Sequence, residues 1–208
     1  MTRIISEMNQ TYMLMLAHAK ALLEKRDPRD IAEKAGVEFD EAGSLFLVPT
    51  LGQVVEIPFP GCEKTREIED YYQLVILHYL DMADGVPLSH RWIPLREGKD
   101  GSIRGANFDT IVDKTLARLL ADTTPEQCEK ACRALGGEII KDKADLTVVF
   151  PLLPRYPLHL SIWFADDEFP AAGKLLIDAS ECHYLSMEDA VTIGEELFKL
   201  LEAELKNA

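Results

Sequence analysis

The sequence predicts an α+β fold in which a mainly antiparallel sheet packs against several helices. Apolar runs typical of strands gather in residues 44–57 and 138–178, and their connections are shorter than parallel crossovers require. Apolar residues recur at helical spacing elsewhere, and an N-terminal helical segment precedes the first strands. Helices and strands do not alternate strictly, which argues against a doubly wound parallel sheet.

The first 36 residues predict two helices. Residues 4–25 carry an apolar stripe at helical spacing. The stripe consists of Ile5, Met8, Tyr12, Met15, Leu16, Ala19, Leu22 and Leu23. We interpret Met8 and Met15 as side chains that fill gaps in the core, in preference to side chains that face a ligand. Asp27 as a cap, Pro28 at the first helical position and Gly36 as a stop predict a short second helix over 28–35.

Residues 44–57 predict a β-hairpin around a Thr-Leu-Gly turn. Thr65 can cap the next helix, which runs to a stop at Gly85. The middle of this helix is apolar on nearly every side, so we expect it to be the central buried helix. His78 lies within it, and a hydrogen-bonded core histidine is the favoured interpretation over a ligand or pH switch.

Residues 89–97 predict a strand, and Pro94 indicates an edge position or a bulge. The glycine-rich loop 98–105 follows and leads into a helix over 107–120. Four basic residues gather here in an otherwise acidic chain: Arg91, Arg96, Lys99 and Arg104. Guanidinium groups beside a helix N-terminus suit a carboxylate or phosphate, so this is the candidate ligand site. A mobile loop with solvated charges is nevertheless the favoured interpretation, and the P-loop pattern is absent.

Thr124 and Gln127 form a capping box for the next helix, which ends at Gly136. Cys128 and Cys132 share one face of that helix. A two-thiolate metal or redox site is conceivable, but free cysteine is commonly a small buried apolar residue, and we favour that interpretation. We expect residues 138–140 to pair with residues 146–150.

The stretch from Val148 to Tyr184 is the most specific part of the chain. Alternation from Leu158 to Phe164 predicts a half-buried strand. Prolines 151, 154 and 157 predict a stiff connection of about seven residues, which favours an antiparallel pair. Residues 174–178 predict a further strand.

Asp166, Asp167 and Glu168 are three adjacent carboxylates that repel one another unless something stabilises them. A cation or proton-handling site is one interpretation. A solvated turn capped by its own aspartates is the favoured one, because aspartate commonly bonds nearby backbone in turns. The alternating spacing of a calcium loop is absent.

Ser186 and Asp189 resemble a capping box at the start of the last helix. Its apolar stripe consists of Ala190, Ile193, Leu197, Leu200, Leu201 and Leu205. Glu195 with Lys199 and Glu202 with Lys206 are expected ion pairs. Cys182 and His183 in the preceding loop are a candidate pair for chemistry.

Composition narrows the classes of partner. The 208 residues fit a single α+β domain, 1–208, with residues 1–36 as its helical N-terminal segment. A net charge of −14 excludes typical nucleic-acid binding and disfavours anionic membranes. No apolar run approaches a bilayer span and no secretion signal is visible, so we expect a cytoplasmic protein with its four cysteines reduced.

Four segments carry a resemblance to a known family. They read WFADDEFPAAGKLLIDAS, HYLSMEDA, LHYL and WIPLREG. They resemble a domain-of-unknown-function family of anaerobic bacteria and archaea, over residues 43–208. The resemblance implies no activity. It does imply that some relatives join this domain to iron–sulfur modules, and so suggests an iron–sulfur or cofactor-related protein partner. This chain lacks the C-x₂-C spacing of such modules and is not expected to bind a cluster itself.

Three classes of function follow. The first is a cytosolic binding or accessory protein for an anionic small molecule or cofactor near the four basic residues. The second is an enzyme that uses His78, His159 or His183 with Asp166, Asp167 or Glu168 as acid and base. The third is a protein-interaction module with an acidic surface. No nucleophile motif and no metal-ligand motif favours the second class, and no cofactor is specified.

Overall fold

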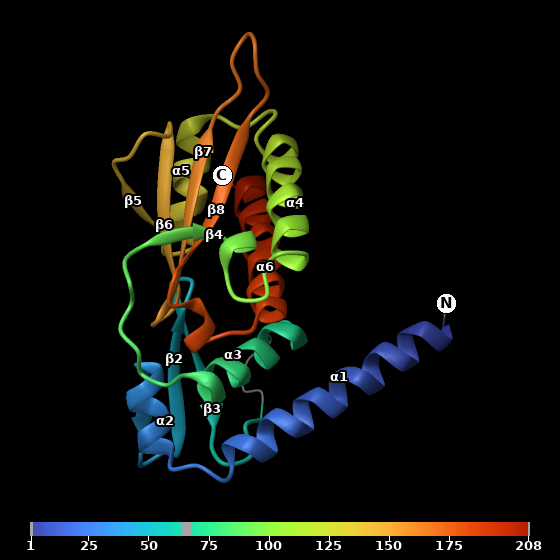
Figure 1. The fold of residues 1–208 in the computed structure, drawn as a ribbon, viewed down its shortest axis with the longest axis vertical. Helices are drawn as coiled ribbons and strands as arrows, with labels where there is room; N and C mark the ends of the chain where they lie inside the picture. Colours follow the sequence, from blue (N-terminus) through green and yellow to red (C-terminus); the bar gives the residue numbers. More distant parts are fainter. Residues whose placement is uncertain (1, 64–67, 208) are drawn as a thin grey trace.

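The computed structural model describes residues 2–63 and 68–207, with the side chains of the first helix from residue 10 onward. Within these residues the chain has an α+β fold with antiparallel pairing throughout, which confirms the predicted class. The strands form two sheets, of three and five strands, where the sequence suggested one. Figure 1 shows them at opposite ends of an elongated molecule.

The bounds of the elements are as follows. The helices are α1 (Thr2–Leu23), α2 (Pro28–Ala35), α3 (Asp70–Met82), α4 (Arg104–Leu119), α5 (Pro125–Ala134) and α6 (Met187–Asn207), with 3₁₀ turns η1 (Leu95–Glu97) and η2 (Glu181–His183). The strands are β1 (Glu38–Asp40), β2 (Leu45–Thr50), β3 (Gln53–Pro58), β4 (Trp92–Pro94), β5 (Glu138–Ile140), β6 (Leu146–Leu153), β7 (Tyr156–Trp163) and β8 (Ala172–Asp178).

The three-stranded sheet contains the predicted hairpin, β2–β3, with β1 added at one edge. Helix α2 precedes it and has the predicted caps. The Asp27 side chain accepts a hydrogen bond from the backbone N–H of Arg29, and Gly36 adopts a left-handed conformation at the C-cap. These caps satisfy helix-end groups that would otherwise lack partners.

The five-stranded sheet has the order β4-β8-β7-β6-β5. Helices α4, α5 and α6 lie side by side against one of its faces, and no helix covers the other face in the described structure (Figure 1). The short β4 is an edge strand, as Pro94 predicted, although it is three residues long and passes directly into η1.

Two expectations for β6 and β7 are wrong. The predicted seven-residue connection is a tight turn at Pro154 and Arg155, and both strands continue through a proline. Pro151 falls in a register irregularity between Phe150 and Leu153, and Pro157 has no partner in the register, so neither proline removes a ladder hydrogen bond.

The second error concerns burial. β7 is buried on both faces, because His159 and Ser161, expected to face solvent, are 3% and 6% exposed. Alternation in sequence identifies the two faces of a strand but not what covers the more polar one.

Helix α3 is the central buried helix that its composition predicts. Thr65, the expected cap, lies outside the described residues. The N-cap is Glu69, whose carboxylate accepts the backbone N–H groups of Tyr71 and Tyr72. Helix α1 packs on α3 and its N-terminal part projects from the body (Figure 1).

Tyr79 of α3 joins three segments through one hydroxyl group. The hydroxyl donates to the Ala35 carbonyl at 2.5 Å and accepts the backbone N–H of Arg155 at 3.0 Å. It therefore ties the end of α2 and the β6–β7 turn to the central helix. The side chain is fully buried.

Two turns meet backbone to backbone. Gly52, in the β2–β3 turn, and Gly136, after α5, both have positive φ, at 74° and 75°. A Cβ atom built on Gly136 would lie 2.8 Å from the backbone nitrogen of Gly52. The contact therefore requires glycine for its space as well as for its dihedral angles.

The buried side chains form one continuous cluster that includes residues of both sheets and of all six helices. On the surface of α6, the expected Glu202–Lys206 pair is present at 3.2 Å, whereas Lys199 pairs with Glu196 rather than Glu195. No helix in the described part of the chain is long and apolar enough to cross a membrane.

Candidate functional site

A buried aspartate fixes the backbone where β8 ends. The Oδ1 atom of Asp178 accepts hydrogen bonds from the backbone N–H and the hydroxyl of both Ser89 and Ser180, at 2.7 to 2.9 Å. Burial raises the pKa of Asp178, but these four hydrogen bonds outweigh burial and lower it. These four hydrogen bonds fix the segment that leads into η2, which begins at Glu181.

A small pocket lies between η2, the end of α3, the start of α6 and the loop before α4. Its volume is about 120 Å³. We call it the Glu181 pocket, and it is lined by Met82, Lys99, Asp100, Glu181, Cys182, Leu185, Ser186 and Met187. Two of the four segments that carry the family resemblance meet here: HYLSMEDA supplies Leu185, Ser186 and Met187 to the lining, and a Cβ atom built on Gly98, the last residue of WIPLREG, would lie 2.9 Å from the Met187 methyl carbon.

Glu181 is the most unusual residue of this pocket. It is 3% exposed, and its Oε1 atom accepts the backbone N–H of Lys99 at 2.7 Å. Its Oε2 atom is buried and has no hydrogen-bond partner in the described structure. Burial raises the pKa of this carboxyl group, and the Lys99 N–H only partly offsets that effect. A buried carboxyl oxygen without a partner is costly, which makes Glu181 the candidate binding residue of this pocket.

The Tyr156 hydroxyl, at the start of β7, is a second buried polar group with no partner among the described residues. Burial raises its pKa well above the usual value, and the nearby carboxylates of Glu181 and Asp189 raise it further. Its proton is therefore firmly held.

A hydrogen-bonded chain borders the pocket on the α6 side. The Ser186 hydroxyl donates to Asp189 Oδ2 at 2.6 Å and accepts the Asp189 backbone N–H at 3.2 Å, which confirms the predicted cap. Asp189 Oδ1 lies 2.8 Å from His78 Nδ1. Because a carboxylate only accepts, His78 donates from Nδ1.

The four basic residues predicted as an anion site do not converge. Arg96 pairs with Asp109 at 3.2 Å, and Arg104 pairs with Glu188 at 3.0 Å. The exposed Arg91 stands before β4, and only Lys99 lines the Glu181 pocket.

Gly105, at the end of the predicted glycine-rich loop, lies in α4 in the structure and permits close packing. A Cβ atom built on Gly105 would lie 2.5 Å from the carbonyl oxygen of Leu95, so this glycine lets α4 cross the η1 turn. Helix α4 begins at Arg104, three residues before the predicted start, and the backbone N–H groups of Ala106 and Asn107 donate to Gly101 and Ile103. These N–H groups are therefore not open to an anion.

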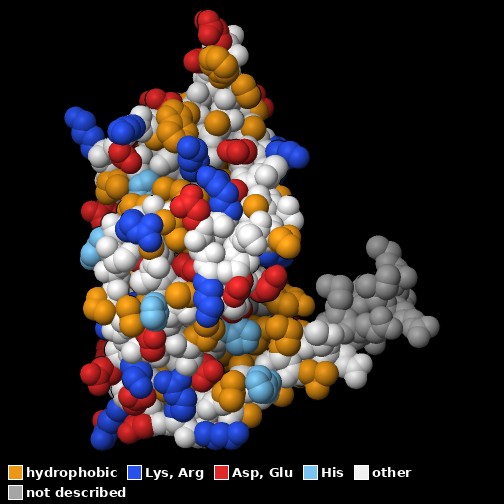
Figure 2. Space-filling view, viewed as in Figure 1, with side chains coloured by type: hydrophobic (Ala, Val, Ile, Leu, Met, Phe, Trp, Pro, Cys, Tyr) orange, Lys and Arg blue, Asp and Glu red, His pale blue; other side chains and the backbone are white. Residues whose placement is uncertain are grey.

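The predicted acid–base residues also lie apart. Asp166, Asp167 and Glu168 are exposed in the β7–β8 loop, which forms the projecting tip of the molecule (Figure 2). The Asp166 carboxylate accepts the backbone N–H groups of Glu168 and Phe169, and these hydrogen bonds lower its pKa.

Each of the other two histidines has its own surroundings. His183 Nδ1 lies 2.6 Å from Asp84 Oδ2. His159 is buried beside the Trp92 ring, with ring centroids 5.1 Å apart, and burial lowers its pKa. None of the predicted acid–base residues lines the Glu181 pocket, and His78 is linked to it only through Asp189 and the lining residue Ser186.

The cysteines do not assemble a ligand set. Cys128 and Cys132 are fully buried side by side on α5, and their mutual hydrogen bond and burial raise the pKa of Cys132 far above the usual value. Within residues 2–63 and 68–207, no three His, Cys, Asp or Glu side chains are arranged to hold a metal ion.

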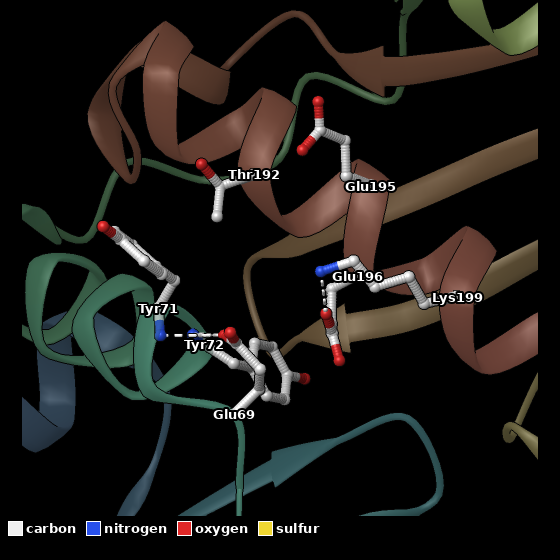
Figure 3. A pocket seen from close by; sticks show the side chains of 7 residues that line it. All are labelled: Glu69, Tyr71, Tyr72, Thr192, Glu195, Glu196 and Lys199. Carbon is white, nitrogen blue, oxygen red and sulfur yellow. Dashed lines mark hydrogen bonds and ion pairs between the residues drawn. The ribbon is translucent and has the colours of Figure 1, made fainter. Parts of the chain in front are cut away.

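A further cleft, of about 200 Å³, separates the start of α3 from α6 (Figure 3). Two of its carboxylates have partners within the fold: Glu69 caps α3, and Glu196 pairs with Lys199 at 3.1 Å. Figure 3 shows both interactions as dashed lines. The Glu181 pocket differs from this cleft in that its glutamate is buried and has a carboxyl oxygen with no partner in the described structure.

Sequence reasoning missed Tyr156 and Glu181. A tyrosine among apolar residues and a glutamate in a loop are common in any chain. Glu181 becomes unusual only in the folded chain, where the hydrogen bonds of Ser89 and Ser180 to Asp178 fix the segment just before η2. The Ser-x-x-Asp spacing was visible, but it identifies a helix start and not its neighbour His78.

Comparison with known proteins yields one match. A family model described as a domain of unknown function, DUF3786, matches residues 27–200. No curated protein and no solved structure shows a significant match to the chain.

Proposed function

The chain belongs to the DUF3786 family, a domain of unknown function, and we propose that it binds a small molecule with both an amino and an acidic group in the Glu181 pocket. The observation that carries the proposal is the buried Oε2 atom of Glu181, which has no partner in the described structure. Lys99 supplies an ammonium group of opposite charge on the same pocket.

The carboxyl group of Glu181 suits a hydrogen-bond donor. Its Oε1 atom is held by the Lys99 N–H, so the side chain is oriented before any ligand arrives. An ammonium group of a ligand that reaches Oε2 would supply the missing hydrogen bond and favour the ionised carboxylate. Orientation in advance lowers the entropic cost of binding.

Lys99 suits the opposite end of the ligand. Its side chain is exposed, lines the pocket and has no ion pair in the part of the chain that the structure describes. It is the one residue of the predicted anion site that remains in the proposal. An amino and a carboxylate group on one ligand would then pair with Glu181 and Lys99 respectively.

The size of the pocket limits the ligand. At about 120 Å³ it is well below the roughly 300–1,000 Å³ typical of drug-sized ligands. Met82, Leu185 and Met187 supply apolar walls. A short amino acid fits this combination of size, charge and apolar contact.

A thermal-shift and calorimetry panel tests the proposal. Glycine, alanine and β-alanine are compared with ethylamine and propionate, each of which has one of the two charged groups. We expect a rise in melting temperature with an amino acid and a smaller rise, or none, with the single-charge probes, because a native-state ligand stabilises by mass action.

Matched variants locate the effect. Glu181→Gln should abolish the response and Lys99→Ala should weaken it, whereas Glu168→Gln, at the exposed tip, should leave it unchanged. An unaltered response in Glu181→Gln, or no response to any of the amino acids, would overturn the proposal.

Binding should also depend on pH. Because the pKa of Glu181 is raised, its carboxyl group takes up a proton as pH falls toward that value, and a neutral carboxyl group attracts an ammonium group less. We expect affinity to increase from the ordinary glutamate pKa, about 4, up to neutral pH, where lysine is still charged. Affinity that is constant over this range would contradict the assignment.

A second candidate function is acid–base chemistry on the bound molecule. It is favoured by the hydrogen bond between His78 and Asp189 beside a carboxyl group of raised pKa. NMR of a binding amino acid incubated with the protein would show turnover or exchange of its α-hydrogen, and His78→Gln should suppress it. An unchanged ligand spectrum after prolonged incubation would contradict this second function and leave binding as the only function proposed for the pocket.

A further inference from the structure

The edge of the five-stranded sheet is only partly covered. β4 pairs with β8 over three residues, and the last pair is Pro94 with Leu176. The chain then leaves the sheet and forms η1. β8 extends four residues beyond this point, to Ala172, and there it pairs only with β7.

This arrangement leaves backbone groups of β8 open. In an antiparallel pair, alternate residues direct their N–H and C=O groups away from the partner strand. In residues 172–175, the backbone N–H and C=O groups that point away from β7 have no strand partner among the residues that the structure describes. Such an edge is a template for another extended segment.

A groove of about 280 Å³ lies along this open edge. One wall is β8 itself, from Gly173 to Leu176, and the other is the face of α4 that carries Val112 and Asp113. Trp92 and Pro94 of β4 close one end. A strand placed in the groove would therefore continue the line of β4 and lie between β8 and α4.

The charges of the groove select its occupant. Asp109 is already paired with Arg96, whose guanidinium also lies 4.0 Å from Glu97. Asp113 is exposed and has no ion pair in the described structure. The chain as a whole carries a net charge of −14, so a second copy is repelled and a basic segment is attracted.

We propose that the open edge of β8 binds an extended segment of a protein partner in which basic and apolar residues alternate. Main-chain hydrogen bonds to the outward-pointing groups of residues 172–175 hold the segment, its apolar side chains contact Trp92, and a basic side chain meets Asp113. Lys174, an exposed charge on the edge, discourages pairing with arbitrary strands. This surface is separate from the Glu181 pocket, so neither proposal depends on the other.

The test uses the full chain, labelled with ¹⁵N, and a blocked seven-residue peptide of alternating lysine and valine. We expect chemical-shift changes along residues 173–175 and slower hydrogen exchange at the amides of Gly173 and Leu175, which point to the same side as the Ala179 N–H that donates to Arg91. The amides of β5, the opposite edge of the same sheet, should not change. A peptide in which glutamate replaces lysine should bind more weakly.

Backbone methylation of the peptide separates strand pairing from side-chain contact. N-methyl groups on alternate residues block the donors of one peptide edge, so one of the two methylated registers should lose binding and the other should retain it. On the protein, Asp113→Asn should weaken binding about two- to five-fold, as for an exposed ion pair, whereas Asp122→Asn should not.

Three outcomes would overturn the proposal. They are no binding of any peptide at millimolar concentration, equal binding of both methylated registers, and shifts at the β8 edge that appear with protein concentration alone. The last outcome would show a second copy of the chain on this edge.

Discussion

At the scale of single residues, one carboxylate oxygen organises the approach to the Glu181 pocket. Asp178 Oδ1 receives four hydrogen bonds from two serines that are 91 positions apart in the chain, Ser89 and Ser180. The hydrogen bonds hold the segment before β4 against the segment after β8. The charge of Asp178 is therefore part of the architecture of the pocket.

Asp178→Asn should lower the free energy of unfolding by about 2–3 kcal/mol at neutral pH, because hydrogen bonds to a buried charge are lost or weakened. The pKa of Asp178 is lowered in the folded state, so its contribution is present above the unfolded-state pKa of about 4 and disappears as pH falls through the folded-state value. Urea titrations at several pH values measure this difference.

The exposed Asp167→Asn is the control for that series and should change stability by less than about 0.5 kcal/mol. A deficit in Asp178→Asn that stays constant into acid would contradict the assignment of the effect to charge.

Tyr79→Phe should cost about 1–3 kcal/mol, because it leaves the Ala35 carbonyl and the Arg155 N–H without their partner. Tyr71→Phe, on the same helix but at the surface, should be nearly neutral. Chemical denaturation of the two variants in parallel measures the difference. Equal effects would show that the buried hydroxyl does not join the three segments.

At the scale of elements, the close crossing of η1 and α4 depends on glycine at position 105, which has no side chain. Gly105→Ala would place a methyl group 2.5 Å from the Leu95 carbonyl, so the helix or the turn must move. We expect a loss of about 1–3 kcal/mol, typical of overpacking. Gly61→Ala, whose nearest neighbour would be 3.8 Å away, is the control and should be tolerated. Thermal melts of both variants measure the two losses of stability, and equal melting temperatures would contradict the prediction.

Elements with local signals could be predicted from the sequence. Capping residues identified α2, α5 and α6, and apolar composition identified α3 as the buried helix. β1, at three residues, is too short to show a pattern. The prolines of β6 and β7 misled because their effect depends on register, which tertiary pairing determines.

The candidate site was predicted only in part, for a related reason. Lys99 and Cys182 were singled out and line the pocket, but Arg96 and Arg104 were expected to be available and instead pair with carboxylates distant in sequence. Sequence shows which charges a chain has. Which of them remain unpaired depends on the fold.

At the scale of the whole molecule, the two sheets share one buried cluster. Helix α3 contacts both α2, beside the three-stranded sheet, and α6, beside the five-stranded sheet, and β2 contacts β6 directly. These contacts predict that both sheets unfold as a single cooperative unit.

Tryptophan fluorescence can test this cooperativity. Both tryptophans, Trp92 and Trp163, lie in the five-stranded sheet, whereas circular dichroism reports on every helix and strand. In a urea titration the two signals should give the same midpoint and the same slope. Two separate midpoints would show that the sheets belong to independent domains.

The meeting of Gly52 and Gly136 has an evolutionary consequence. Each glycine occupies the room that a side chain on the other would need, so neither position is free to drift while its counterpart stays in place. Among descendants of a common ancestor, the two should be kept together or lost together, as one paired trait spread over 84 positions of the chain.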